Sequence, residues 1–312
     1  MAAPHPRSVS PISRCRDTPG SNVSSVFQRR PHRYRARDRV IELGAVTRIM
    51  GILNVTPDSF YDGGRFLDPS AAAAQARRIA EAGADILDIG AQSTRPGSIG
   101  ISAEEELSRI VPVLEALGDD YPLPVSIDTS KAEVARKALE RGASIINDVT
   151  SLQNDPEVGK LVAESGAGIV LMHMRGTPAT MQQMPPSPDI MQELEEWVKV
   201  AVERAKRCGI SCDRIMIDPG IGFGKSAEQN IEILRNLDRL AAFGLPILVG
   251  TSRKSFIGMI LKKSAADRIW GTGATVAASI MFGAHVVRVH DVAEMKDISR
   301  VTDAMLAGRL LE

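Results

Sequence analysis

Eight short apolar segments, each followed by a helical pattern, predict an α/β fold of the (β/α)8 barrel type for residues 39–312 of this 312-residue chain. Each strand-and-helix unit has about the length of one barrel repeat. An open, doubly wound sheet would leave two strand edges and usually carries a GxGxxG fingerprint after its first strand, and none follows the first strand here. A closed barrel, preceded by a short N-terminal hairpin and a disordered leader, is therefore the predicted architecture.

The predicted strands are apolar runs without polar alternation, as expected for strands buried on both faces. The run Ile-Met-Ile before Asp218 is typical, because Pro219 and Gly220 stop it and a glycine-rich turn follows. Such a turn leaves backbone N–H groups free to face a ligand, although an ordinary strand-to-helix turn has the same composition. Strands are predicted at residues 48–55, 86–90, 125–128, 144–147, 168–173, 215–218, 246–250 and 285–289.

Helices are predicted between these strands from start and stop signals. The helix at 69–82 ends before Gly83, and the helix at 103–117 begins after Ser102, with Glu105 at capping-box spacing. Residues 255–282 are expected to be helical with a break around the glycines at 271–273. The other helices are predicted to end at 141, to span 156–165, to run from 189 to about 208, and to span 228–240 and 292–307.

Residues 1–38 differ in composition from the rest of the chain and are predicted to be a disordered leader. Residues 1–39 hold nine arginines and no lysine, with many serines and prolines and only Asp17 and Asp38 as acids. An organellar transit peptide or a nucleic-acid-binding arm has the same composition, but the segment lacks a clear amphipathic period. We expect a solvated extension, with organellar import as the alternative.

Charge and cysteine content exclude several classes of protein. The formal net charge is zero, so no overall field attracts nucleic acid or membrane, and no apolar run approaches the roughly 18 residues of a membrane span. Cys15, Cys208 and Cys212 show no paired metal-binding spacing, which favours a reduced, cytoplasmic protein. The expected partners are small-molecule substrates.

Polar residues stand at nearly every predicted strand end, where a barrel core would favour Val, Ile and Leu. The carboxyl ends of barrel strands meet at one rim, so we expect these side chains to form a binding site there. They are Asn54, Asp88, Asp128, Asn147, His173, Asp218, Lys254, Arg288 and His290.

Asp128, Asn147 and Asp218 suit the edge of a flat heterocycle. A carboxylate can accept from a ring N–H and an exocyclic NH2 together, and an asparagine can both donate and accept. For Asp128 the alternative is a helix N-cap, because a helix is predicted just after it. His173 is expected to be a satisfied rim histidine without a direct catalytic role.

A second set of rim residues is cationic and predicts an anionic portion of the ligand. Arg95, Lys254, Arg288 and His290, together with Asn54, could hold a phosphate or diphosphate whose oxygens are bridged by Mg2+. Each cation could instead be a surface salt-bridge partner, and for Arg253 that alternative has at least equal weight. The loops at 56–64 and 93–100 combine glycine, proline and polar groups and are candidate lids.

Eight motifs, in order from residue 50 onwards, resemble those of the dihydropteroate synthases, a family of pterin-binding barrels. They come in the family's order and span nearly the whole chain from about residue 40, so the resemblance is specific. The motifs are MGILNVTPDSFYDGG (50–64), DIGAQSTRPGS (88–98), SIDT (126–129), INDV (146–149), LMHMRGTP (171–178), IDPGIGFGK (217–225), TSRKSFIG (251–258) and RVHDV (288–292).

The resemblance implies a transferase of folate biosynthesis. Such an enzyme joins a dihydropterin-methyl diphosphate to 4-aminobenzoate, releasing diphosphate and forming dihydropteroate, and sulfonamides would compete with 4-aminobenzoate. The residues implied are Asp128, Asn147, Asp218, Lys254 and Phe223 for the pterin; Asn54, Arg288 and His290 for the diphosphate, with Asn54 also for Mg2+; Phe60, Thr94, Arg95, Pro96 and Ser255 for the aminobenzoate; and Asp62, Arg95 and Lys254 for catalysis.

In the implied reaction the diphosphate leaves the pterin methylene and the arylamine attacks, so electrostatic stabilisation of the leaving group carries the rate. Asp62 is expected to stabilise the cationic intermediate. A homodimer is also implied, as is usual in the family. Two departures affect loop detail only: Gln92 stands where the family often has Glu, and Tyr61 where it often has Ser.

Two other readings compete with this one. A pterin-barrel methyltransferase that serves a corrinoid protein would share the acidic pocket, but it would not need the 93–97 loop or the run at 252–255. A non-catalytic folate-binding or RNA-binding protein would depend on the basic leader.

Overall fold

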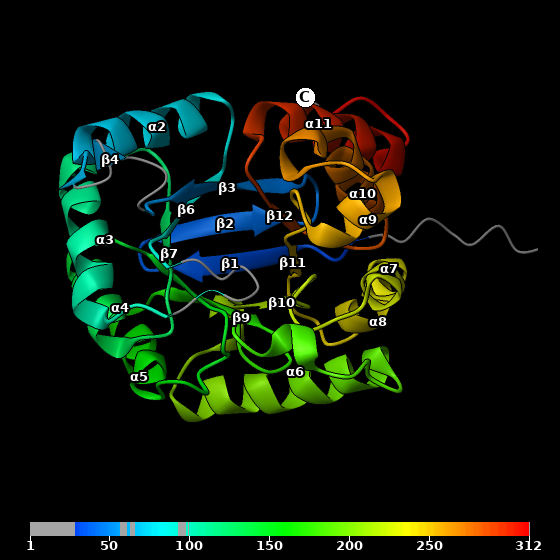
Figure 1. Ribbon diagram of the computed structural model, residues 1–312, viewed down its shortest axis with the longest axis horizontal. Coiled ribbons are helices and arrows are strands. Elements are labelled where there is room, and N and C mark those ends of the chain that lie inside the picture. The colour runs from blue at the N-terminus through cyan, green and yellow to red at the C-terminus, as the bar shows by residue number, and fades with distance from the viewer. Residues whose placement is uncertain (1–28, 57–60, 63–65, 93–97, 99, 312) are drawn as a thin grey trace, which may run out of the picture.

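Eight parallel strands form the sheet at the centre of the molecule (Figure 1). Their order is β10-β9-β8-β7-β6-β3-β12-β11. The two ends of this order meet, because Ile217 bridges Ile247 and its amide donates to the Pro246 carbonyl at 3.0 Å. The predicted (β/α)8 barrel is confirmed. The strands are β3 (Arg48–Asn54), β6 (Ile86–Gly90), β7 (Val125–Asp128), β8 (Ile145–Asp148), β9 (Gly168–Met172), β10 (Ile215–Asp218), β11 (Leu248–Val249) and β12 (Val286–Val289).

Helices surround this sheet in the computed structural model, which describes residues 29–56, 61–62, 66–92, 98 and 100–311 (Figure 1). Their apolar faces pack on the outer side chains of the strands and form the main core. The helices are α2 (Pro69–Glu81), α3 (Ala103–Leu117), α4 (Ala132–Glu140), α5 (Glu157–Ser165), α6 (Ile190–Arg207), α7 (Ala227–Arg235), α8 (Leu237–Ala241), α9 (Ser255–Leu261), α10 (Ile269–Met281) and α11 (Val292–Ala307). A small antiparallel pair, β4 (Tyr61–Asp62) and β5 (Phe66–Leu67), lies apart from the barrel sheet.

The predicted helix break around residues 271–273 is wrong, because α10 runs through both glycines. A Cβ on Gly271 would lie 2.3 Å from Cγ2 of Ile257, and one on Gly273 would lie 2.4 Å from Cδ1 of Ile298. These glycines therefore allow close helix packing. The break comes earlier, where Lys262 adopts a φ of 54° and ends α9. The helix expected at 228–240 is likewise divided in two, at Asn236.

A two-stranded hairpin, β1 (His32–Ala36) and β2 (Arg39–Leu43), closes the amino end of the barrel. Every second residue points inward, so Tyr34 and Leu43 are buried against side chains near the amino ends of the barrel strands. Gly168 at the start of β9 leaves room for this contact, because a Cβ there would lie 2.4 Å from the Tyr34 Oη. The amino end is thus filled by packed side chains.

The hairpin begins earlier than the sequence predicted. β1 lies inside the range 1–38 that was expected to be disordered, so the boundary at residue 38 is too late. Arg29 is also ordered: its Nη2 lies 2.5 Å from Oδ1 of Asp303, and its Nη1 donates to Oγ1 of Thr47 at 2.6 Å. The arginine-rich composition concealed a short alternating strand, since Arg33 and Arg35 point outward while Tyr34 points inward.

Among the described residues, no helix combines the length and apolar character needed to cross a membrane.

Replacing Tyr34 with alanine is expected to lower the free energy of unfolding by about 3–5 kcal/mol, the usual cost of removing a buried aromatic ring. Tyr34→Phe is expected to keep the stability or raise it by about 1 kcal/mol, because the buried hydroxyl has no hydrogen-bond partner within the described part of the chain. Urea unfolding followed by circular dichroism measures both values. A clear loss of stability in the phenylalanine variant would contradict the idea that the hydroxyl contributes nothing.

Candidate active site

Arg288 connects three strands across the carboxyl mouth of the barrel. Its Nε donates to Oδ2 of Asp88 on β6 at 2.6 Å, and its Nη2 donates to Oδ2 of Asp128 on β7 at 3.1 Å. Asn147 on β8 donates from Nδ2 to the same Asp88 oxygen at 3.4 Å. Asp128 and Asn147 lie in register on neighbouring strands, and Asp88 stands two residues before Gly90, the register partner of Asp128 on β6. A guanidinium fork suits this task because it can serve two carboxylates at once.

This cluster is buried, and it retains unused acceptor atoms. Asp88 is 0% exposed and Asn147 is 4% exposed, and the Oδ1 atom of each has no hydrogen-bond partner among the described residues. Burial raises the pKa of Asp128 to about 7, and the charge of Arg288 limits that rise. Buried acceptors without a protein partner are costly, so this cluster is built to receive donors from a ligand.

Asp218 ends β10 and is held by the turn that follows it. The Gly220 amide donates to Oδ1 of Asp218 at 2.7 Å. Gly220 needs its φ of +67°, and a Cβ there would lie 1.9 Å from the His173 carbonyl oxygen. Burial raises the pKa of Asp218 to about 6, while the Gly220 hydrogen bond and the charge of Lys254 act in the opposite direction. The turn therefore presents a fixed carboxylate at the rim.

Phe223 and Lys254 lie together beside this turn. The Nζ of Lys254 stands 4.1 Å from the centre of the Phe223 ring, a cation–π contact. Burial, together with the charge of Arg288, lowers the pKa of Lys254 to about 8, although Asp218 and Asp128 favour its charged form. The aromatic face and the ammonium thus lie on the same side of the opening as the Asp218 carboxylate.

His290 adds a neutral imidazole to the rim, next to Arg288 on the same strand end. Burial, and then the charge of Arg288, lowers its pKa to about 4, so the imidazole is uncharged at neutral pH. Its Nδ1 lies 3.0 Å from Oγ of Ser252, which also accepts the His290 backbone N–H at 3.3 Å. Asn54 ends β3, the strand between β12 and β6, and it is half-buried.

Two interpretations from the sequence can be decided directly. The N-cap reading of Asp128 is wrong: Lys131 occupies that position at α4, and the Ala132 amide donates instead to Oδ2 of Asp155 at 2.9 Å. The salt-bridge reading of Arg253 is confirmed, because its guanidinium contacts both carboxylate oxygens of Asp291, at 3.1 and 2.5 Å.

The remaining predicted site residues stand on other elements or outside the described part of the chain. Ser255 begins α9 and is exposed, and Asp62 belongs to β4. Four more lie outside the described residues, namely Phe60, Thr94, Arg95 and Pro96.

Asp88 and Ser252 take part in the site. The sequence placed Asp88 at the rim without a particular role, and it named Ser252 only as part of a motif. A signal for Asp88 was present, since it is the one charged residue in the buried strand ILDIG. A charge that a fully buried strand retains must have a partner in the fold. No comparable signal identified Ser252, whose contact with His290 depends on two loops meeting.

The comparisons with known proteins agree with this geometry. The family model described as "Pterin binding enzyme" matches residues 50–290, so the chain belongs to the pterin-binding enzymes. A dihydropteroate synthase of Synechocystis sp. is 47% identical over 267 residues, covering 85% of this chain and 92% of the relative. Within the pterin-binding class, the chain belongs to the dihydropteroate synthases, which are transferases.

Two solved structures of the same family are similar over nearly their full length. The Clostridium difficile dihydropteroate synthase with pteroic acid has a TM-score of 0.79 and 44% identity, covering 84% of this chain and 98% of its own. The Xanthomonas albilineans dihydropteroate synthase with 4-aminobenzoic acid has a TM-score of 0.81 and 41% identity, covering 88% of this chain and 99% of its own.

Arg288→Met is expected to lower the free energy of unfolding at pH 8 by about 3–5 kcal/mol, because Asp88 and Asp128 would stay buried without their cation. The loss is expected to shrink towards pH 5. Removing the guanidinium raises the pKa of Asp128 further above about 7, so the variant gains more than the wild type from protonation as the pH falls.

Urea unfolding at pH 8, 7, 6 and 5 measures this difference. Arg33→Met is the matched control, since its ion pair with Glu42 is exposed and its loss should cost less than about 1 kcal/mol. A deficit in the Arg288 variant that is the same at every pH would contradict the role assigned to the buried carboxylates.

Proposed function

We propose that this rim condenses (7,8-dihydropterin-6-yl)methyl diphosphate with 4-aminobenzoate to give 7,8-dihydropteroate and diphosphate. The observation that carries the proposal is that one buried mouth holds both unused acceptors and donors of several kinds. Asp88 and Asn147 each keep an oxygen without a hydrogen-bond partner among the described residues, and a guanidinium, a neutral imidazole and an ammonium stand at the same rim. One substrate with a donor-rich ring and an anionic tail fits this combination.

The pterin ring is assigned to Asp218, Asn147 and Asp128, with Lys254 and Phe223 beside it. The Asp218 carboxylate can accept from a ring N–H and the neighbouring exocyclic NH2, while Asn147 can give and take. The unpartnered Oδ1 of buried Asn147 supports this assignment, because a donor from the ring would satisfy it. Phe223, with Lys254 over its face, offers a flat apolar wall to a flat ring.

The diphosphate is assigned to Arg288, His290 and Asn54. The Nδ1 of neutral His290 faces the Ser252 hydroxyl, so the ring can carry its proton on Nε2. This N–H can donate a hydrogen bond to a phosphate oxygen. Arg288 keeps further N–H groups beyond the two that bind carboxylates. These donors would stabilise the charge that collects on the leaving diphosphate.

Mg2+ is proposed to enter with the diphosphate, bound through Asn54. The donor chemistry fits, because Mg2+ prefers oxygen ligands and usually binds through few protein groups plus phosphates and water. No cluster of three or more His, Cys, Asp or Glu able to hold a metal occurs in the described ranges. A single amide oxygen with substrate oxygens is consistent with that. When bound, the ion would neutralise charge on the diphosphate.

The aminobenzoate pocket is proposed from the family resemblance: Phe60, Thr94, Arg95 and Pro96, with Ser255 towards the carboxylate. Asp62, Arg95 and Lys254 are proposed as catalytic groups. In the reaction, the methylene carbon–oxygen bond breaks and the electron pair leaves with the diphosphate. The arylamine nitrogen then bonds to the methylene and loses a proton to water. This sequence needs no covalent intermediate with the protein.

The test is product formation by the purified full chain with the pterin diphosphate, 4-aminobenzoate and Mg2+. We expect dihydropteroate and diphosphate in equal amounts, and loss of both when 4-aminobenzoate is omitted or EDTA is added. Pterin binding without condensation, or methyl transfer to a corrinoid protein, would overturn the proposal.

A homodimer is proposed from exposed apolar side chains on adjoining helices. On α9, Met259 is 66% exposed and Ile260 is 59% exposed, and on α10 Trp270 is 78% exposed. α9 and α10 lie side by side in Figure 1, and side chains of this size rarely gather on the free surface of a monomer. A second copy of the chain is the proposed occupant.

Trp270→Glu is expected to convert the dimer into a monomer at micromolar concentration, because it places a charge in the centre of an apolar contact. Size-exclusion chromatography with light scattering measures the mass. Val200→Glu on α6 is the matched control, since Val200 is 58% exposed but lies on a different helix. A monomeric wild type, or a Trp270 variant that stays dimeric, would refute the proposed interface.

The compartment is proposed to be the cytoplasm, supported by free cysteines at Cys208 and Cys212. Organellar import through the arginine-rich leader is the alternative.

A further inference from the structure

We propose that Lys225 is a positioning residue for pterin binding: it fixes the two rim loops that follow β9 and β10, without touching the substrate itself. The inference rests on the proposed function, because it concerns how the pterin side of that site keeps its shape. Lys225 follows the glycine-rich turn after Asp218 and precedes α7, whose N-cap is Ser226.

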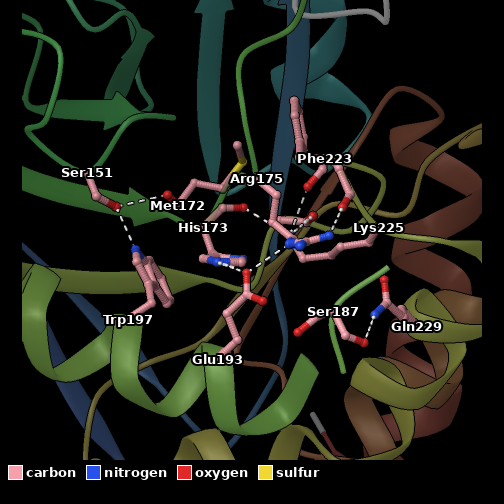
Figure 2. A network of polar contacts seen from close by, with 12 residues as sticks. Ser151, Met172, His173, Arg175, Ser187, Glu193, Trp197, Phe223, Lys225 and Gln229 are labelled. Atoms are coloured by element: carbon pink, nitrogen blue, oxygen red, sulfur yellow. Dashed lines mark hydrogen bonds and ion pairs between the residues drawn. The ribbon is translucent and has the colours of Figure 1, made fainter. Parts of the chain in front are cut away.

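The ammonium of Lys225 binds three backbone carbonyls. Its Nζ lies 2.9 Å from the Gly220 oxygen. It also lies 3.1 Å from the His173 oxygen and 3.1 Å from the Phe223 oxygen (Figure 2). A lysine ammonium has three N–H donors, so each hydrogen has one carbonyl. No ion pair within salt-bridge distance is formed by Lys225 in the described part of the chain. Burial lowers its pKa to about 7, while the charges of Asp218 and Glu193 favour the ammonium form. The side chain is thus used as a three-way hydrogen-bond donor.

These three carbonyls belong to two different loops. His173 follows β9, whereas Gly220 and Phe223 belong to the turn after β10. Within that turn, the Gly220 amide holds the Asp218 carboxylate, and the Phe223 ring carries the Lys254 ammonium. Without Lys225, three converging carbonyl oxygens would lose their common donor and repel one another. Both the Asp218 carboxylate and the Phe223 ring would then shift relative to Asn147.

The turn has other supports that do not depend on Lys225. The Gly222 amide donates to Oδ1 of Asn230 at 2.7 Å, and Arg175 donates from Nη1 to the Gly224 oxygen at 3.3 Å. Arg175 is itself held by Glu193, at 2.9 Å from its Nε (Figure 2). Because these contacts remain, losing the ammonium should displace the turn while the barrel stays folded. The predicted defect is therefore one of ligand geometry.

The test uses Lys225→Met, which keeps an unbranched side chain of similar length and removes all three N–H donors. The probe is 6-hydroxymethyl-7,8-dihydropterin, which lacks the diphosphate and so reports on ring binding alone. Its Kd by calorimetry is expected to rise about tenfold or more, equivalent to losing one to two hydrogen bonds at the ring edge. The Kd for inorganic diphosphate with Mg2+, and the KM for 4-aminobenzoate, should stay within about twofold.

Ser226→Ala is the matched control for stability. Ser226 caps α7 by accepting the Gln229 amide at 3.2 Å, so its loss weakens the adjacent helix but leaves the ammonium in place. This variant should lower the Tm without changing the pterin Kd. A Lys225→Met variant with wild-type pterin affinity, or a Ser226→Ala variant with the same loss of affinity, overturns the positioning role.

A second variant, Lys225→Arg, tests the proposal even where Lys225→Met does not fold. Lys225→Arg keeps the charge, but a planar guanidinium cannot direct three N–H groups from one nitrogen at three carbonyls. It should weaken pterin binding less than methionine does, and unchanged affinity would overturn the proposal. The wild-type protein in the same assays separates the two questions. If it forms no dihydropteroate, the proposed function fails; if it does and the Lys225 variants bind pterin normally, only this inference fails.

Discussion

A single guanidinium inside the mouth of the barrel is the interaction on which the site depends. Arg288 comes from β12 and binds carboxylates from β6 and β7, so it holds together strands on different sides of the opening. Without it, two carboxylates buried this deeply would destabilise the fold until they were protonated. A buried ion cluster of this kind seldom stabilises a fold more than apolar packing would. Its value here is that it fixes polar groups where a ligand can use them.

The loops around the mouth show the same principle with backbone groups in place of carboxylates. The turn after β10 has glycines at the positions where its chain approaches the loop after β9 most closely. Such close approach brings carbonyl oxygens together, and a buried cation is then needed to satisfy them. Side chains that never meet the ligand can therefore decide where the ligand-binding groups lie.

The barrel was predictable from sequence because its signal is repeated eight times. Buried parallel strands appear as short β-branched runs, and their ends carry polar residues that packing alone does not explain. The glycines of α10 misled the prediction, since helix propensity says nothing of neighbouring helices that need the space of a missing Cβ. The first hairpin strand was hidden because its outward arginines dominate the composition of a short segment.

The site was predictable only in part, for a physical reason. Asp218 and Arg288 stand at strand ends, where topology alone brings them to the rim. Which group binds which was not visible, as the pairing of Asp128 with Arg288 shows, because such contacts join segments far apart in the chain. The role of Lys225 was still harder to predict from the sequence. Its partners are backbone carbonyls, which every residue has, so its role leaves no pattern of residue types.

The hairpin determines at which end of the barrel a fusion partner or a support can be attached. It fills one end of the barrel, and Arg29 is anchored there beside Thr47 and the Ala284 carbonyl, on the side away from the polar rim. The described part of the chain therefore begins at the closed end of the barrel, opposite the polar rim. A purification tag, a solid support or another enzyme joined directly to Arg29 in place of residues 1–28 would meet that closed end, and the end that faces substrates would stay open.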